Sequence, residues 1–332
     1  MNRSVNRFLT SKKGFTYILV TSFLVVVLLL VFFTTSNYKY QDQEAVQQIR
    51  IRAMNDFMKN LDDDIHRATY ISAFRSLLAL ETHVSTNVSK DFREVFFYGT
   101  LNGVSQGDII NESTFEIYLS RVQNLSKSTG IILDINVTDV SLTQSDPWSV
   151  DVHLTMNITA VDVKNTSAWH INKEYVTNLP IDTLRDPLYV KIIGNSSPTI
   201  RKLDVPFFVN NTDVTNLKAH IEGVYYINSS YAPSYIMRLA GNNSPDPNGN
   251  GIESIVNIQD LENLLPTNPG LLIDYNKVKI DYLYFNTNIT FNNSDKLCNI
   301  TGLPSTDYFV IPSNRRAMYQ LQNVTLVNGT CP

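Results

Sequence analysis

The segment 246–252 has the ligand spacing of the front half of a calcium-binding loop. Asp246, Asn248 and Asn250 place side-chain oxygens at positions 1, 3 and 5, a glycine follows at position 6, and the carbonyl of Ile252 takes position 7. Position 12, where such loops hold a bidentate glutamate, is Asn257. A weak calcium site is one interpretation, and calcium is the only cofactor that the sequence suggests. A turn built from Asn, Gly and Pro is the alternative.

The histidines do not have the spacing of a catalytic or metal-binding motif. There are five, at His66, His83, His153, His170 and His220. The chain contains no HExxH sequence, no GxSxG turn and no phosphate-binding glycine loop. The carboxylates Asp62 and Asp64 are typical of a solvated helix face. The sequence therefore predicts no catalytic residues and a protein that is not an enzyme, with an anchored hydrolase as an alternative.

Cys298 and Cys331 are the two cysteines of the chain. A bridge between them would close a loop of about 34 residues and stabilise this part of the chain by about 3–4 kcal/mol on the loop-entropy estimate. We expect a disulfide, and two free thiols are the alternative.

Acceptor sequences for N-linked glycans are more frequent than chance predicts. With 35 Asn and 55 Ser and Thr residues, random placement would give roughly six Asn-X-Ser/Thr sequences, whereas the chain has 16. One is at Asn2, and the others are at Asn87, Asn111, Asn124, Asn136, Asn157, Asn165, Asn195, Asn210, Asn228, Asn242, Asn288, Asn292, Asn299, Asn323 and Asn328. This excess predicts a glycosylated, exported chain, and an unmodified Asn- and Thr-rich composition is the alternative.

Composition and charge narrow the class of protein. The chain is 43% hydrophobic, 17% charged and 11% aromatic, which argues against a disordered protein. Its 27 basic and 31 acidic residues give a net charge of −4, so no nucleic-acid partner is expected. The scarcity of cysteine in an exported chain argues against a eukaryotic ectodomain and favours an archaeal surface protein.

The N-terminal residues predict a membrane anchor. Residues 1–14 form a basic leader without an acidic residue, and residues 15–33 form an apolar run. Nineteen helical residues span about 28 Å, close to the hydrocarbon thickness of a bilayer. Because the positive charge precedes the span, we expect a cytoplasmic N-terminus, a single pass through the cell membrane and an extracellular bulk.

The order of these features resembles the class III signal of type IV prepilins, archaeal ones included. Lys13 and Gly14 directly precede the apolar run, and in that family a prepilin peptidase cuts after this glycine. The resemblance implies a mature chain that begins at Phe15 and packs laterally with other pilin-like subunits. It also implies a disulfide near the C-terminus. Leu19 occupies the position of a glutamate usual in major subunits, which favours a minor subunit. A plain uncleaved signal anchor is the alternative.

Beyond the span, the sequence predicts an extracellular amphipathic helix at 34–86. Apolar residues recur at three- and four-residue steps, at Val46, Ile49, Ala53, Phe57, Leu61, Ile65, Ala68, Ile71, Phe74 and Leu78. No Gly or Pro occurs from Phe15 to Tyr98, so one helix from Phe15 to Leu80 would be about 100 Å long. We expect this stripe to be the packed face of the helix.

Residues 87–192 predict a head of the pilin type. A helix is expected from Ser113 to Ser128, because Ser113 and Glu116 have capping-box spacing. Apolar and polar residues then alternate over 131–138 and 150–159, and a third strand is expected near 169–177. Asn136 and Asn157 fall on the polar side of their strands. The predicted fold class is α+β, with an antiparallel β-meander packed on the long N-terminal helix.

Residues 193–332, here called the C-terminal lobe, are expected to be loop-rich and mainly β. Strands are expected at KVKIDYLYFN (277–286) and RRAMYQLQNVTLVN (315–328). The segments DPLY (186–189) and GIES (251–254) are similar to segments of archaeal pilin-like surface proteins.

Together these features predict a pilin-like, membrane-embedded surface glycoprotein of a type IV pilus-like filament, with a structural or adhesive role. Its expected partners are the lipid bilayer, other pilin-like subunits and a prepilin peptidase. The alternative is an uncleaved, signal-anchored surface glycoprotein whose C-terminal lobe binds a glycan or a partner protein or cell.

Overall fold

The structure is a computed structural model that describes residues 12–83, 85, 87–210, 213–266, 268, 270–275, 277–286, 297–299 and 310–321. The chain divides into two compact units. The first comprises Met1–Asp62 with Val161–Ala168, and the second comprises Asp63–Ala160 with Trp169–Pro332.

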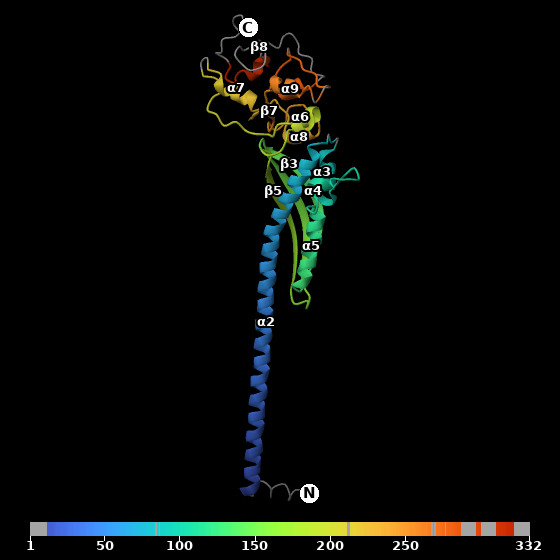
Figure 1. Ribbon diagram of the computed structural model, residues 1–332. Coiled ribbons are helices and arrows are strands. Elements are labelled where there is room, and N and C mark those ends of the chain that lie inside the picture. Colours follow the sequence, from blue (N-terminus) through green and yellow to red (C-terminus); the bar gives the residue numbers. More distant parts are fainter. Residues whose placement is uncertain are drawn as a thin grey trace. The chain divides into compact units, whose positions relative to one another are not determined.

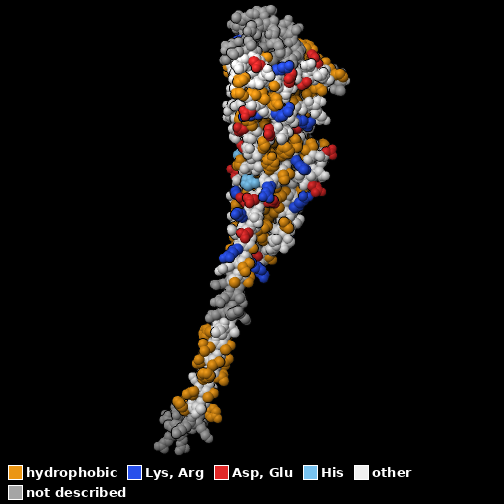
Figure 2. All heavy atoms as spheres, turned by 60° about the vertical axis from the view of Figure 1, so that its left-hand side comes forward, with side chains coloured by type: hydrophobic (Ala, Val, Ile, Leu, Met, Phe, Trp, Pro, Cys, Tyr) orange, Lys and Arg blue, Asp and Glu red, His pale blue; other side chains and the backbone are white. Residues whose placement is uncertain are grey.

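Helix α2 runs from Lys12 to Leu80 (Figure 1). Within it Phe15–Thr35 has a mean hydropathy of 2.8 and is entirely exposed. Figure 2 shows orange side chains along this stretch with no charged side chain among them. The hydroxyls of Thr34 and Thr35 donate to the carbonyls of Leu30 and Val31 at 2.9 and 2.8 Å, so these two hydroxyls are satisfied within the helix.

This stretch is long and apolar enough to cross a bilayer, as a membrane anchor or a signal sequence. In the part of the chain that the structure describes, it is the one helix with this property.

The buried face of α2 differs from the predicted stripe. Of that stripe only Leu61 and Ile65 are fully buried, whereas Val46, Ile49 and Ile71 are exposed. The buried positions of α2 are Met54, Met58, Leu61, Ile65, Thr69, Ser72, Ala73, Ser76, Leu77, Ala79 and Leu80. The predicted stripe is displaced by about one residue over much of its length, because Met54, Met58, Thr69 and Ser72 are buried and each follows a stripe position, and because small hydroxyl residues also pack in the interior. A hydroxyl can be buried here because it bonds within the helix, as Thr69 does to the carbonyl of Ile65 at 2.7 Å.

The helix ends at Leu80, the end considered for a single helix from Phe15, and not at 86, the predicted boundary of the amphipathic segment. Local polar contacts start a new helix instead. The Oδ1 of Asn87 accepts the N–H of Lys90 at 3.1 Å and caps α3 (Val88–Tyr98). Gly99 closes α3 with φ +66°, and a Cβ there would meet Thr114 at 3.0 Å. Both strands of the following hairpin, β1 (Thr100–Leu101) and β2 (Val104–Ser105), are short, and α4 spans Gly107–Ile110.

The predicted helix at 113–128 is confirmed as α5 (Phe115–Ser128). Its cap is Thr114 rather than Ser113, and the Oγ1 of Thr114 accepts the N–H of Ile117 at 3.3 Å. The aromatic rings of Phe96 and Phe115 stack at 5.0 Å and join α3 to α5. Gly130, at φ +79°, turns the chain into the sheet.

The three predicted strands are confirmed and are longer than expected. They are β3 (Ile131–Asp146), β4 (Ser149–Asp162) and β5 (Ala168–Pro180), in the order β3-β4-β5, joined by short turns as in an antiparallel meander. In Figure 1 the sheet lies beside α5. The alternation is confirmed, because every second residue of β4 from Val150 to Ala160 is buried. In the second unit the sheet also contacts α2, since the rings of His66 and Tyr175 meet edge to face at 5.2 Å.

The C-terminal lobe has more helix than the sequence predicted. Helix α6 (Pro187–Ile193) adjoins the lobe. The described elements of the lobe itself are η1 (Gly194–Ser196), α7 (Thr215–Glu222), β6 (Tyr226–Asn228), α8 (Tyr235–Leu239), β7 (Ile252–Ser254), α9 (Ile258–Leu264), α10 (Asp281–Tyr284), β8 (Leu297–Asn299), β9 (Val310–Pro312) and η2 (Ser313–Arg315). Strands β6 and β7 pair antiparallel, as do β8 and β9. The class α+β is therefore confirmed, and in the described part of this lobe helix exceeds strand, which corrects the mainly β expectation.

Two predicted strands of this lobe are corrected. Residues 281–284 form α10, because the N–H groups of Tyr284 and Phe285 bond to the carbonyls of Ile280 and Asp281 at 2.7 and 2.9 Å. Residues 316–320 form turns, and 322–328 lie outside the described residues. The expected boundary near 192 falls inside α6, whose Leu188 is buried in one cluster with Leu217 and Ile255.

Candidate functional site

All sequon asparagines whose side chains the structure describes are exposed. These are Asn87, Asn111, Asn124, Asn136, Asn157, Asn165, Asn195, Asn210, Asn228 and Asn242. Asn136 and Asn157 lie on the outer face of β3 and β4, as their alternation predicted. Asn87 caps α3 through its side-chain oxygen. The amide nitrogen, to which a glycan would be attached, is not used in this cap. Exposure makes each position accessible, and occupancy remains a prediction. Asn288, Asn292, Asn323 and Asn328 lie outside the described residues, and only the backbone of Asn299 is described.

The predicted processing residues lie in the first turns of α2. Lys13 and Gly14 are described as helical backbone, and the side chain of Phe15 is exposed. Leu19 is also exposed, with 56% of its surface accessible. Cleavage after Gly14 remains a prediction.

The predicted calcium loop is held closed by the protein's own groups. The Oδ1 of Asp246 accepts the N–H groups of Asn248 and Asn250 at 2.8 and 3.3 Å. The amide of Asn250 donates to the carbonyl of Gln144 at 2.9 Å, and the carbonyl of Ile252 accepts from the Arg238 guanidinium. Asn257, at position 12, caps α9. The carbonyl assigned to position 7 thus already faces a cationic side chain, and this arrangement fits the turn alternative.

The glycine at position 6 also has a reason other than calcium. A Cβ on Gly251 would lie 2.0 Å from the carbonyl oxygen of Ala232 and 2.5 Å from that of Ser229. The backbone therefore passes too close for any side chain.

We predict that Gly251→Ala lowers the thermal unfolding temperature of the full chain by roughly 5–10 °C, because the backbone must move to admit the methyl group. Gly107→Ala is the matched control, since a Cβ there meets only the Ser105 hydroxyl at 3.4 Å. EDTA is expected to leave the unfolding temperature unchanged. A fall on adding EDTA that calcium reverses would contradict the turn interpretation.

The predicted disulfide cannot be placed, because Cys331 lies outside the described residues. The backbone of Cys298 is described, in β8 opposite Ile311 of β9.

A buried arginine that sequence analysis did not identify joins four segments. Arg238 Nη1 donates to Oδ2 of Asp186 at 2.5 Å and to Oδ2 of Asp281 at 2.9 Å, and all three side chains are fully buried. Asp186 caps α6, Asp281 opens α10, and Arg238 belongs to α8. Its Nη2 donates to the carbonyl of Ile252 in β7. The guanidinium therefore connects three short helices and a strand.

Both carboxylates of this network accept further hydrogen bonds. Asp186 accepts from the N–H of Leu188 at 2.9 Å and the hydroxyl of Tyr226 at 2.8 Å. Asp281 accepts from the N–H and hydroxyl of Ser254 at 3.2 and 3.1 Å. Burial raises the pKa of Asp186, and the charge of Arg238 opposes that shift. Because solvent does not reach these groups, the network holds the fold together and is not a ligand site.

A second buried pair lies beside it. Arg315 Nε donates to Oε2 of Glu253 at 3.2 Å, and the guanidinium lies over the ring of Tyr231 at 4.1 Å. Burial raises the pKa of Glu253, and Arg315 opposes the shift. The segments DPLY and GIES also meet in the interior. The hydroxyl of Tyr189 from the first segment lies 3.2 Å from the hydroxyl of Ser254 from the second.

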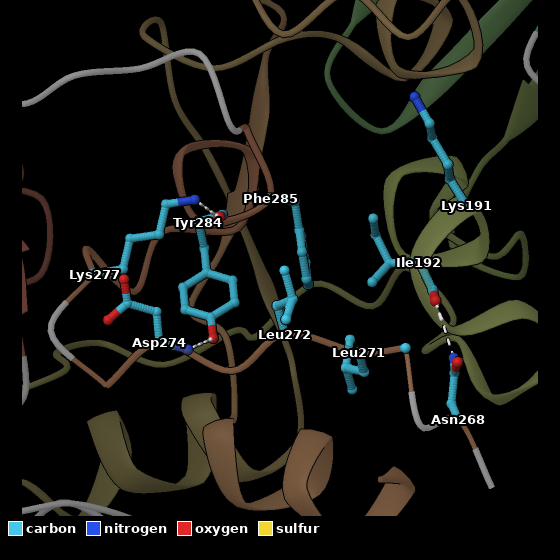
Figure 3. Close-up of a pocket in the computed structure, with 10 residues that line it drawn as sticks. Lys191, Ile192, Asn268, Leu271, Leu272, Asp274, Lys277, Tyr284 and Phe285 are labelled. Carbon is cyan, nitrogen blue, oxygen red and sulfur yellow. Dashed lines mark hydrogen bonds between the residues drawn. The ribbon is translucent and has the colours of Figure 1, made fainter.

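The described residues also form a cavity of about 510 Å³ at the surface of the C-terminal lobe (Figure 3). It is bounded by residues of α6, of the loop after α9 and of the end of α10, namely Lys191, Ile192, Asn268, Gly270, Leu271, Leu272, Asp274, Lys277, Tyr284 and Phe285. Its volume is within the range of small-molecule sites, about 300–1,000 Å³. No sequence motif marks it, because its residues come together only through the packing of α6, α10 and the loop after α9.

Two lysines lie over the ring of Tyr284, and one of them, Lys277, lines the cavity. Lys277 Nζ donates to the carbonyls of Tyr284 and Asn286, and burial lowers its pKa. Lys279 is 2% exposed and donates to the carbonyl of Tyr275 at 2.7 Å. Burial lowers its pKa to about 8. Both ammonium groups therefore bind carbonyls of the lobe itself.

Comparison of the chain with protein-family models, with curated proteins and with solved structures gives no match.

Proposed function

We propose that this chain is a pilin-like, membrane-embedded surface glycoprotein, a minor subunit of a type IV pilus-like filament that is processed after Gly14. The observation that carries the proposal is α2, which joins an exposed apolar stretch at Phe15–Thr35 to a second, amphipathic stretch without interruption. Lipid, a prepilin peptidase and other pilin-like subunits are the proposed partners.

The exposed apolar residues of α2 beyond the span support lateral packing. Val46, Ile49 and Ile51 have accessible fractions of 51%, 65% and 46%. Val46 and Ile49 are three residues apart and share one face of the helix, whereas Ile51 lies on the other side, so Val46 and Ile49 form the exposed apolar face that a neighbouring surface would cover. Helices of neighbouring subunits would supply that cover.

The alternative is an uncleaved anchor that displays a binding lobe, and the cavity beside α6 favours it. The two functions are separated by the N-terminus of the protein from native membranes, read by mass spectrometry of the terminal peptide. A start at Phe15 supports prepilin processing. A start at Met1 would contradict the pilin-like proposal and leave the anchored glycoprotein.

We predict that Ile49→Lys reduces co-assembly with neighbouring subunits at least tenfold, because a charge would enter an apolar helix contact. Gln47→Lys is the matched control, since it adds the same charge at an exposed polar position of the same helix. Cross-linking of a tagged copy in native membranes, followed by mass-spectrometric quantification of the pilin-like chains that co-purify with it, measures the effect. Equal losses in both variants would contradict a specific apolar contact.

A further inference from the structure

We propose that the cavity bounded by α6, the loop after α9 and Phe285 binds a pyranose unit of a saccharide. A pyranose ring carries hydroxyls around its edge and C–H groups on its faces. It fits a cavity with hydrogen-bonding groups at its ends and apolar side chains between them. The inference goes beyond the proposed filament role and does not depend on cleavage at Gly14.

Tyr284 supplies a hydrogen-bond donor at one end of the cavity. Its hydroxyl oxygen accepts the N–H of Asp274 at 2.9 Å, and the residue is only 4% exposed. Figure 3 shows this contact at the tip of the ring. Since the oxygen is used as an acceptor, the hydroxyl proton is available to a ligand, and no acceptor for it is found among the described residues.

Asn268 supplies both a donor and an acceptor at the other end. Its Nδ2 donates to the carbonyl of Ile192 at 3.2 Å, drawn as a dashed line in Figure 3. This bond fixes the orientation of the amide, and it leaves Oδ1 and the second N–H of Nδ2 for a ligand. One sugar hydroxyl can donate to Oδ1 of Asn268, and a neighbouring hydroxyl can accept from the free N–H of its Nδ2.

Apolar side chains lie between these ends. Figure 3 shows Leu272 between Tyr284 and Ile192, close to Phe285. Leu272 is 88% exposed, so its side chain is accessible to the C–H face of a sugar ring. Phe285 is held edge to face against Tyr189 at 5.0 Å and Tyr284 at 5.3 Å, so the apolar wall is fixed before a ligand arrives.

The charges around the cavity favour a neutral sugar over an anion. The ammonium group of Lys277 is bound to two backbone carbonyls. The Lys191 side chain extends away from the other labelled residues in Figure 3. Neither cation is therefore directed at the space between Tyr284 and Asn268.

The test is saturation-transfer difference NMR on the full-length protein, in a detergent without a sugar headgroup that could compete. The probes are the methyl glycosides of glucose, galactose, mannose and N-acetylglucosamine, and octanoate as an acyl-chain probe. We expect transfer to the ring C–H protons of at least one glycoside. Asn268→Leu and Tyr284→Phe should each weaken that binding about tenfold, because each leaves a sugar hydroxyl unpaired. Lys218→Ala, which removes an exposed lysine of α7 that does not line the cavity, is the matched control and should not change it.

Three results would overturn the proposal. The first is that no glycoside receives transferred saturation at millimolar concentration. The second is that Asn268→Leu and Tyr284→Phe both leave the transfer unchanged, and the third is that octanoate alone receives it. Thermal unfolding checks that each variant is folded. If Tyr284→Phe is destabilised, because the N–H of Asp274 loses its acceptor, then Asn268→Leu and Leu272→Asp decide the question.

Discussion

Replacing Arg238 with methionine is expected to lower the free energy of unfolding by about 3–5 kcal/mol, one of the two largest effects that the structure predicts. The variant removes the cation from between Asp186 and Asp281, whose side chains are fully buried. Two carboxylates would then be left in the interior without a counter-charge, and methionine fills the volume without replacing the hydrogen bonds. Differential scanning fluorimetry of the full chain should record a fall of roughly 10 °C in the unfolding temperature.

Arg201→Met is the matched control for this prediction. The Arg201 guanidinium donates to the carbonyl of Gly223 at 3.2 Å and lies over the ring of Tyr225 at 5.2 Å, but the residue is exposed. Its loss should cost less than about 1 kcal/mol. The deficit of Arg238→Met should also shrink below about pH 5, because the stranded carboxylates of the native variant take up protons more readily than those of the unfolded chain. A variant as stable as the wild type at pH 7 would contradict the network.

The elements that the sequence predicted well are those whose pattern is local. Each of β3, β4 and β5 buries one face against the core, so alternation alone reveals it, as Val150 and Val152 in β4 do. Helix α5 has a capping residue and a closing glycine within 16 residues of each other, at Thr114 and Gly130. The apolar span of α2 is evident from hydropathy alone.

The features that the sequence did not predict depend on long-range packing. Asp186, Arg238 and Asp281 are separated by 52 and 43 residues, so no spacing rule could bring them together. The helices of the C-terminal lobe have between four and eight residues, too few to establish a 3.6-residue period. The local signal that was available is at α6, where Asp186 followed by proline is a helix-start pattern. For the same reason the cavity between Asn268 and Tyr284 has no sequence signature.

The second large effect is a dependence of stability on pH that originates at His220. Its side chain is fully buried between Phe208 and Tyr319, with ring centroids 5.1 and 5.7 Å away. Neither ring nitrogen has a hydrogen-bond partner among the described residues, and burial lowers its pKa to about 3. The unfolded chain takes up a proton at this histidine below about pH 6.5 while the native state does not. Its contribution to the free energy of unfolding therefore falls by about 1.4 kcal/mol for each pH unit between about 6.5 and 3.

His220→Phe should remove this dependence. At pH 7 the variant is expected to be at least as stable as the wild type, because an unpaired polar ring is replaced by an apolar one of similar shape. At pH 4.5 it should exceed the wild type by about 2–3 kcal/mol. His83→Phe is the matched control, at a half-buried position in the turn after α2. It should leave the difference in free energy of unfolding between pH 7 and pH 4.5 as in the wild type.

The comparison between variants is essential because other buried groups act in the opposite direction. Burial raises the pKa of Asp186 and Glu253, so the native state binds protons there more readily than the unfolded chain and gains relative stability on acidification. The slope of the wild type is the sum of both effects, and it can be shallow even though each is large. Only the difference between His220→Phe and the wild type isolates the histidine. Equal slopes for the two proteins between pH 7 and pH 4.5 would mean that water reaches the His220 ring, and α7 would then not pack against Phe208 and Tyr319 in solution.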